Sequence, residues 1–135
     1  MSLLILIDAG ALLNSSAFQF LKKNKYITTA LVDSEIKDFK SRLLVQQAID
    51  AGLLSIENPE KEFLLKANEK LVETNSRISN ADISVFALAL RLKSEKKKFT
   101  VLTDDYSVQN ELLREKIKFE GILRGEIKKS VSFRK

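Results

Sequence analysis

The chain is expected to fold as an α/β protein, with a central, mostly parallel sheet of four to five strands between two layers of helices. Two observations predict this three-layer α/β/α sandwich. Short apolar segments alternate along the chain with longer segments of helical periodicity. The first apolar run, 3–7, contains no polar residue, which is typical of a central parallel strand covered on both faces.

The individual elements follow from local signals. Strands are expected at 3–7, 25–28, 53–56, 99–102 and 117–120. Helices are expected at 18–23, 30–37, 39–51, 59–73, 80–97 and 106–115. Residues 1–125 are assigned to one domain, and 126–135 to a basic tail whose loose alternation suggests an edge strand.

Several helix starts carry capping signals. Thr29 and Ser79 are expected to cap the helices that follow them, and Asn58 is expected to do so with Pro59 in the first helical position. One of the neighbouring residues Asp104 and Asp105 is expected to cap the next helix. In the helix at 39–51, the residues expected to face inward are Leu43, Leu44, Ala48 and Ile49.

The composition excludes several classes of chemistry. The chain has 135 residues, no Cys and no His, so disulfides, thiol nucleophiles, His-containing triads and a zinc site in this chain are ruled out. No apolar run approaches the length of a membrane span, and the protein is expected to be cytoplasmic. The net charge of +5 favours a nucleic-acid partner over a membrane.

Acidic residues recur where such a sheet would bring them together. Asp8 follows the first strand and the Asp104-Asp105 pair follows the fourth, while Glu35 and Asp82 lie on helices. Ligands bind at the carboxyl ends of parallel strands, so these carboxylates are expected to share one pocket. Carboxylates that repel one another favour a hard divalent cation, Mg²⁺ or Mn²⁺, and hence metal-assisted hydrolysis of a nucleic acid.

Each acid also has a purely structural alternative. Asp8 would then cap the turn after its strand, Glu35 would be a solvated helix residue, and Asp82 would complete a capping box with Ser79. Ser79, Ser84 and Thr103 are interpreted as caps and buried hydroxyls, with orientation of the carboxylates or binding of phosphate as the alternatives. The hypothesis therefore depends on the joint placement of the acids.

The order of these acids resembles that of PIN-domain nucleases. Three segments, 29–42 with Glu-Ile-Lys-Asp and Ser-Arg, 79–90, and 103–110 with Thr-Asp-Asp-Tyr-Ser-Val-Gln-Asn, resemble the Nin-one-binding ribonuclease family. That resemblance implies an endoribonuclease that matures the 3′ end of small-subunit ribosomal RNA in ribosome biogenesis. It also implies a precursor of the small subunit and a KH-domain assembly factor as partners.

The resemblance assigns roles to particular residues. It implies that Asp8, Glu35, Asp82 and Asp105 are catalytic and hold Mn²⁺ or Mg²⁺, with Asp104 as an auxiliary ligand or a cap. Gln109 and Asn110 are expected to be structural. The number of metal ions, the cleavage site and the oligomeric state stay open. A VapC-type toxin ribonuclease and a non-catalytic RNA-binding assembly factor are the alternative functions.

The basic residues fall into two groups. Lys128, Lys129, Arg134 and Lys135 in the tail are the RNA-binding candidates. The run of Lys93, Lys96, Lys97 and Lys98 is interpreted as a solvated helix end that complements the helix dipole, with RNA contact as its alternative. Family members continue into a zinc ribbon where this sequence stops, so a form without that module is expected to bind RNA weakly.

Overall fold

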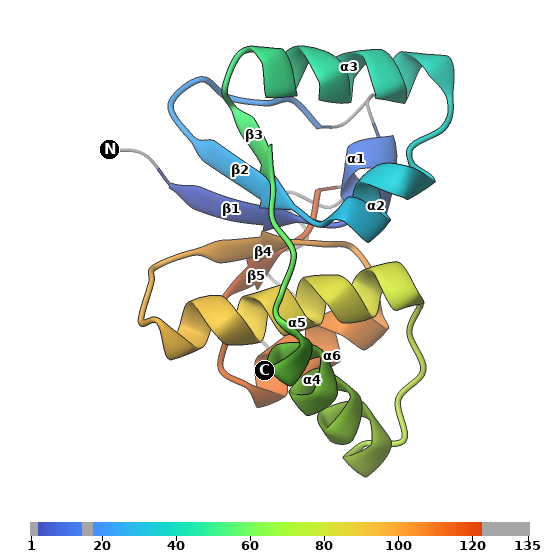
Figure 1. Cartoon of the computed structure of the whole chain (residues 1–135), viewed down its shortest axis with the longest axis vertical. Helices are drawn as coiled ribbons and strands as arrows, with labels where there is room; N and C mark the ends of the chain where they lie inside the picture. The colour runs from blue at the N-terminus through green and yellow to red at the C-terminus, as the bar shows by residue number, and fades with distance from the viewer. Residues whose placement is uncertain (1–2, 15–17, 123–135) are drawn as a thin grey trace.

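A single five-stranded parallel sheet forms the centre of the molecule. The computed structural model describes residues 3–14 and 18–122, and its strands lie in the order β3-β2-β1-β4-β5 (Figure 1). Each neighbouring pair is parallel. The strands are β1 (Leu4–Ile7), β2 (Lys25–Thr28), β3 (Leu54–Ile56), β4 (Thr100–Leu102) and β5 (Phe119–Glu120).

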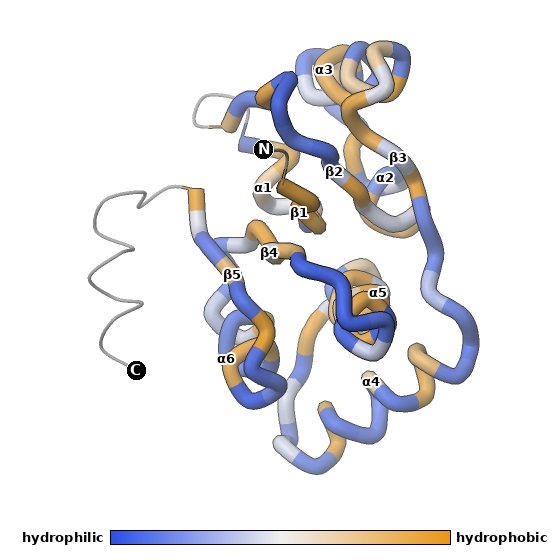
Figure 2. The backbone as a smooth tube through the Cα atoms, turned by 90° about the vertical axis from the view of Figure 1, so that its left-hand side faces the viewer, coloured by the Kyte–Doolittle hydropathy of each residue, from blue (hydrophilic) through white to orange (hydrophobic). Residues whose placement is uncertain are grey.

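Helices cover both faces of this sheet. The helices are α1 (Ala9–Leu13), α2 (Ala30–Glu35), α3 (Phe39–Asp50), α4 (Lys61–Glu73), α5 (Asn80–Ser94) and α6 (Tyr106–Arg114). Figures 1 and 2 place α1 and α3 on one face, and α4, α5 and α6 on the other. The predicted three-layer α/β/α sandwich is therefore confirmed.

The central strand and α5 make up much of the core. Leu6 and Ile7 of β1 are fully buried, as expected for a strand with helices on both faces. The apolar stripes predicted for α5 also face inward, with Ile83 partly buried and Val85, Phe86, Leu88, Leu90 and Leu92 buried. These residues anchor the helix that carries Asp82 against the sheet.

The chain reverses its direction of travel across the sheet at β1. It first builds β2 and β3 on one side of β1, then returns to build β4 and β5 on the other side. Ile7 pairs with Leu102, so β1 and β4 end side by side. In open α/β sheets, such a switch point at the carboxyl ends of the strands is the usual ligand site. Asp8 and the Asp104-Asp105 pair follow these two strand ends.

The predicted helix at 18–23 is wrong, and the structure has an unpredicted helix before it. The segment at 18–23 contains no helix; instead Phe18 and Phe20 pack edge-to-face on Tyr26, with ring centroids 5.8 and 4.9 Å from that ring. Residues two apart that contact the same ring fit an extended backbone rather than a helix. The helix in this part of the chain is α1, which comes before this segment and begins directly after β1, where Asp8 caps it.

The start of α4 and the inward face of α3 also differ from the prediction. Asn58 Oδ1 accepts a hydrogen bond from Ala30 N at 3.0 Å, so it does not cap α4, which begins at Lys61 after Glu60. In α3, Val45 and Ala48 are buried, whereas Leu43 and Leu44 are exposed. Helix α2 ends at Glu35, two residues before the expected end, and α5 ends at Ser94 rather than 97.

One arginine fastens the connection between β3 and α4 to α5. The Arg91 guanidinium donates to Glu57 Oε1 at 2.5 Å and to Glu60 Oε2 at 3.5 Å. Both acids lie in the segment that links β3 to α4 (Figure 1). Within 3–14 and 18–122, no helix has the length and apolar character needed to cross a membrane.

Candidate active site

Asp8 is a buried carboxylate at the carboxyl end of β1. It is only 3% exposed. Ala11 N donates to Asp8 Oδ1 at 2.9 Å, which caps α1, and the Thr103 hydroxyl donates to the same carboxylate. The capping role that the sequence offered as an alternative is therefore real. It does not exclude a site role, because Asp8 also lines the cavity described below.

The environment of Asp8 disfavours its charged form. Burial raises the pKa of Asp8 from 3.8 to about 6, against the lowering effect of the bonds from Thr103 and Ala11. The negative charges of Asp82 and Asp105 raise it further. A buried carboxylate that is opposed by two other carboxylates is typical of a site that a cation completes.

Asp82 lies in the first turn of α5. Ser79 caps that helix as predicted, with Asp82 N donating to Ser79 Oγ at 3.1 Å. The pKa of Asp82 is raised, first by burial, then by the charge of Asp105, with a smaller contribution from Glu35. The hydrogen bond from the Ser79 hydroxyl opposes this rise. Asp82 is thus electrostatically coupled to acids from two other helices.

A buried hydrogen bond holds the Asp82 and Glu35 helices together. Thr29 caps α2, and its Oγ1 lies 2.7 Å from Ser84 Oγ on α5. Glu35 is the last residue of α2 and is exposed. The hydroxyl of Ser84, which the sequence left as either a buried hydroxyl or a carboxylate partner, thus joins the two helices that carry the acids.

Arg42 fixes the end of α2 next to Glu35. Its guanidinium donates to the backbone oxygens of Asp33 and Ile36 at 3.1 and 3.3 Å, and to Asp33 Oδ1 at 2.7 Å. It therefore gives a partner to the carbonyl of Ile36, the C-cap, and a second donor to Asp33 O, which already accepts from Ile36 N. This contact gives a physical reason for the Ser-Arg step after Glu-Ile-Lys-Asp in the sequence.

The neighbours Asp104 and Asp105 have different roles. Asp105 caps α6, since Ser107 N and Val108 N donate to its Oδ1 at 2.8 and 3.2 Å. Asp104 Oδ1 accepts from Ile122 N at 2.8 Å. The prediction that one of the pair is a cap is confirmed, but the cap is Asp105, and Asp104 instead ties β4 to the chain after β5.

Gly121 makes the Asp104 contact possible. A Cβ atom at position 121 would overlap Asp104 Oδ1, closer than any real contact. A side chain there would therefore displace a carboxylate that Ile122 N holds in place. In the same loop, Gln109 Nε2 donates to Thr103 O at 2.8 Å, the structural role expected for it.

All five predicted acids line one cavity. Its volume is about 360 Å³, and its acidic lining comes from the ends of β1 and β4 and from α2 and α5. Those five are Asp8, Glu35, Asp82, Asp104 and Asp105. Gly10, Leu13 and Asn14 of the α1 region also line it, and the sequence did not single them out, because α1 itself was not predicted.

The donor set suits a hard divalent cation. Every acidic donor is a carboxylate, and Mg²⁺ is usually held by one or two protein carboxylates with waters completing its shell. Across 3–14 and 18–122, no three acidic side chains already meet closely enough to ligate one ion. A cation held there would need waters, or movement of these side chains, to complete its coordination. The tail residues Lys128, Lys129, Arg134 and Lys135 lie outside the described residues.

Comparison with known proteins defines the family. Residues 5–92 match the family described as the PIN domain of ribonuclease. The fold, the acidic cavity and this match together show that the chain belongs to the PIN-domain ribonucleases.

Within that class, the chain is similar to proteins named Endoribonuclease Nob1. It is 36% identical to the one from Pyrococcus abyssi over 132 residues, which are 96% of this chain and 78% of that protein. The one from Methanocaldococcus jannaschii is 33% identical over 129 residues, or 96% of this chain and 61% of that protein. The sequence resemblance is thereby confirmed, and its family is one of endoribonucleases.

PIN toxins are also related to this chain. Ribonuclease VapC3 from Aeropyrum pernix is 32% identical over 107 residues, covering 78% of this chain and 76% of that protein. A crystal structure of VapBC2 from Rickettsia felis, bound to a promoter DNA fragment, superimposes with a TM-score of 0.58. The two share 14% identity over 89% of this chain and 99% of that one, so the likeness shows a common fold.

Proposed function

We propose that this protein is a divalent-cation-dependent endoribonuclease whose active site is the cavity lined by Asp8, Glu35, Asp82 and Asp105. The observation that carries the proposal is the convergence of these acids at the switch point of the sheet. The raised pKa values of Asp8 and Asp82 support it, because burial first, and the charges of neighbouring carboxylates second, disfavour the ionised form of both groups.

The acidic residues would hold the cation, and the contacts around them would fix their positions. When bound, Mn²⁺ or Mg²⁺ would activate water and offset the charge that develops on the phosphate. Asp8 is held in place, since it is buried and accepts from Ala11 N and Thr103. Asp82 and Glu35 belong to two helices that Thr29 and Ser84 hold in register. Such rigidity favours catalysis because the ligands need little reorganisation.

The absence of His from the sequence leaves proton transfer to carboxylates, Lys, Tyr or activated water. Water would attack the phosphorus in line, and the family resemblance implies a 5′-phosphate and a 3′-hydroxyl as products.

The finer proposal concerns the substrate. The similarity to proteins named Endoribonuclease Nob1 extends over 96% of this chain, compared with 78% for VapC3. On this basis we assign the protein to maturation of the 3′ end of small-subunit ribosomal RNA, with a KH-domain assembly factor as a partner. A toxin ribonuclease is the second candidate, favoured by the 32% identity to VapC3.

The test is cleavage of a covalently closed circular RNA that contains the small-subunit 3′-end sequence, in Mn²⁺ and in excess EDTA. We expect linear product in Mn²⁺ and none in EDTA, since only an endonuclease can open a circle. A scrambled circle of the same length is the specificity control. Cleavage of both circles at equal rates would contradict the ribosomal assignment, and an intact native circle in Mn²⁺ would contradict the endonuclease assignment.

A further inference from the structure

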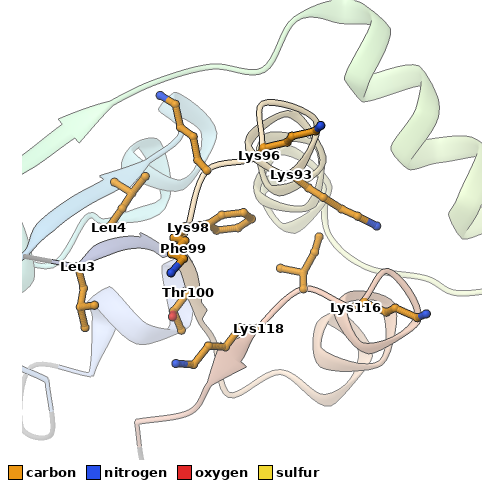
Figure 3. Close-up of a pocket in the computed structure, with 11 residues that line it drawn as sticks. Leu3, Leu4, Lys93, Lys96, Lys98, Phe99, Thr100, Lys116 and Lys118 are labelled. Carbon is orange, nitrogen blue, oxygen red and sulfur yellow. The ribbon is translucent and has the colours of Figure 1, made fainter.

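Six lysines surround a second cavity at the end of the sheet where β4 and β5 begin. This lysine cluster consists of Lys93, Lys96, Lys97, Lys98, Lys116 and Lys118 (Figure 3). The cavity has a volume of about 580 Å³ and an apolar floor that includes Leu3, Leu4 and Phe99. None of the described residues that line it is acidic. The strands β4 and β5 begin at this edge, whereas the acidic cavity lies where the strands end.

Two equivalent turns place the lysines there. The chain leaves α5 through Lys96 and α6 through Lys116, and these residues lie in the left-handed region with φ of 60° and 61°. The hydrogen bonds match in the two turns: Lys96 N donates to Lys93 O, and Lys116 N donates to Leu113 O. Glycine or asparagine is preferred at such a position, because a longer side chain is strained there. The chain thus has lysine at two turns where local structure favours another residue.

The helix dipole explains only part of this charge. Lysines in the last turn of a helix complement its dipole, but Lys98 and Lys118 lie beyond the helices, at the entrances to β4 and β5. Figure 2 shows the hydrophilic stretch that carries the first of them between α5 and β4. The cluster therefore extends past the range in which a helix terminus would favour cations.

Most of the cluster is unpaired within the part of the chain that the structure describes. Lys93 forms an ion pair with Glu115 and donates to its backbone oxygen, and Lys97 lies 3.7 Å from Glu95. None of the four other lysines, Lys96, Lys98, Lys116 and Lys118, has a carboxylate within ion-pair distance in residues 3–14 and 18–122. All four are exposed. Lysines of like charge around one cavity favour a polyanion as its occupant.

We propose that the lysine cluster binds the phosphate backbone of RNA at a distance from the bond that is cleaved. Helix α5 runs 12 residues from Asp82 to its end at Ser94, which is roughly 18 Å at the rise of an α-helix, and Lys96 lies in the turn beyond that end. The phosphates at the cluster would therefore belong to a different segment of the RNA from the scissile one. Phe99 is half-buried and lines the same cavity, so its exposed part would add an apolar contact to a base or ribose. The proposal rests on the endoribonuclease function above.

The test is a quadruple variant with Lys96→Asn, Lys98→Gln, Lys116→Asn and Lys118→Gln. Asparagine is chosen at the two left-handed positions because it tolerates that backbone conformation. Binding of a fluorescent ribosomal 3′-end RNA is measured by anisotropy in EDTA over a series of salt concentrations. The matched control variant changes four exposed lysines that line no cavity with the cluster: Lys22, Lys23, Lys40 and Lys61 to Gln.

We expect the cluster variant to bind the RNA at least about 10-fold more weakly than the control at low salt. The log–log salt slope should become shallower by about 0.7 for each phosphate that the variant no longer neutralises. Cleavage of an oligonucleotide too short to span the roughly 18 Å from Asp82 to the end of α5 should be unchanged in Mn²⁺. Equal affinities and slopes for the two variants would overturn the proposal.

Two further results distinguish this inference from the endoribonuclease function and from binding to a membrane. A cluster-dependent loss of binding, together with a wild-type protein that cleaves no RNA, would support the cluster and contradict the nuclease function. Binding of the cluster to vesicles of anionic phospholipid, with no cluster-dependent binding of RNA, would overturn the RNA assignment in favour of a membrane surface.

Discussion

The Asp82→Asn variant is expected to cleave RNA at least about 100-fold more slowly in Mn²⁺ than the wild-type protein. Substitutions in the outer shell of a metal site already cost about 10- to 100-fold, and the proposal places Asp82 among the direct ligands. Its carboxylate is coupled to both Asp105 and Glu35, so its loss removes the charge between those two acids. The rate is measured under single-turnover conditions with saturating enzyme.

The fold should survive this change. Ser79 Oγ accepts from the backbone N of residue 82, and that bond does not need the carboxylate. Asp50→Asn is the matched control, because Asp50 is an exposed acid at the end of α3 whose oxygen accepts from Gln46. The control should cleave at the wild-type rate. An Asp82→Asn protein that is folded and fully active would show that the acidic cavity is not the active site.

The Asp8→Asn variant is expected to be more stable than the wild type when no metal is present, by up to about 3 kcal/mol at neutral pH. The pKa of Asp8 is about 6 in the folded state and near its ordinary value of 3.8 in the unfolded state. This difference converts to about 3 kcal/mol. Asparagine can keep the capping bond from Ala11 N to Oδ1 without a buried charge.

The sign of the pH dependence follows from the direction of this shift. A raised pKa in the folded state means that the folded protein holds the Asp8 proton more tightly than the unfolded chain. The contribution of Asp8 to stability is therefore complete below about pH 4 and is lost as the pH rises through about 6. The advantage of Asp8→Asn should grow over the same interval.

Urea unfolding in EDTA at about pH 4.5 and about pH 7.5 measures this difference. Gly10→Ala is a suitable control, since position 10 is an exposed helical site whose added Cβ would come no closer than 3.8 Å to Asp8. Its effect should be similar at both pH values. A stability difference for Asp8→Asn that does not change with pH would refute the buried-charge explanation.

The sequence predicted that the five acids share one cavity because its signals are local. Apolar runs mark β1 and β4, and the acids that follow them must lie at the carboxyl edge of a parallel sheet. Ser79 and Thr29 are caps in the structure for the reasons that the sequence suggested. Once the starts of α2 and α5 are known from these caps, the positions of Glu35 and Asp82 on the two helices follow.

The failures come from contacts between distant residues. Asn58 has the sequence features of a helix cap. Its side-chain oxygen instead accepts a hydrogen bond from Ala30 N, which is 28 residues away in the sequence. Phe18 and Phe20 were assigned to a helix because nothing in the local sequence shows that Tyr26 lies beside both. The lysine cluster could not be predicted as one site for the same reason, since its α5 and α6 halves meet only when β5 lies next to β4.

The central claim is that the acidic cavity binds a divalent cation, and direct titration with Mn²⁺ tests it most simply. Electron paramagnetic resonance of free Mn²⁺ reports how much of the ion the protein has bound, with no dependence on RNA or on catalysis. We expect saturable binding by the wild-type protein, a loss of at least about 10-fold in affinity in Asp8→Asn and Asp82→Asn, and unchanged binding in Asp50→Asn. Equal binding by all four proteins, or none by the wild type at millimolar Mn²⁺, would contradict the assignment of this cavity as the metal site.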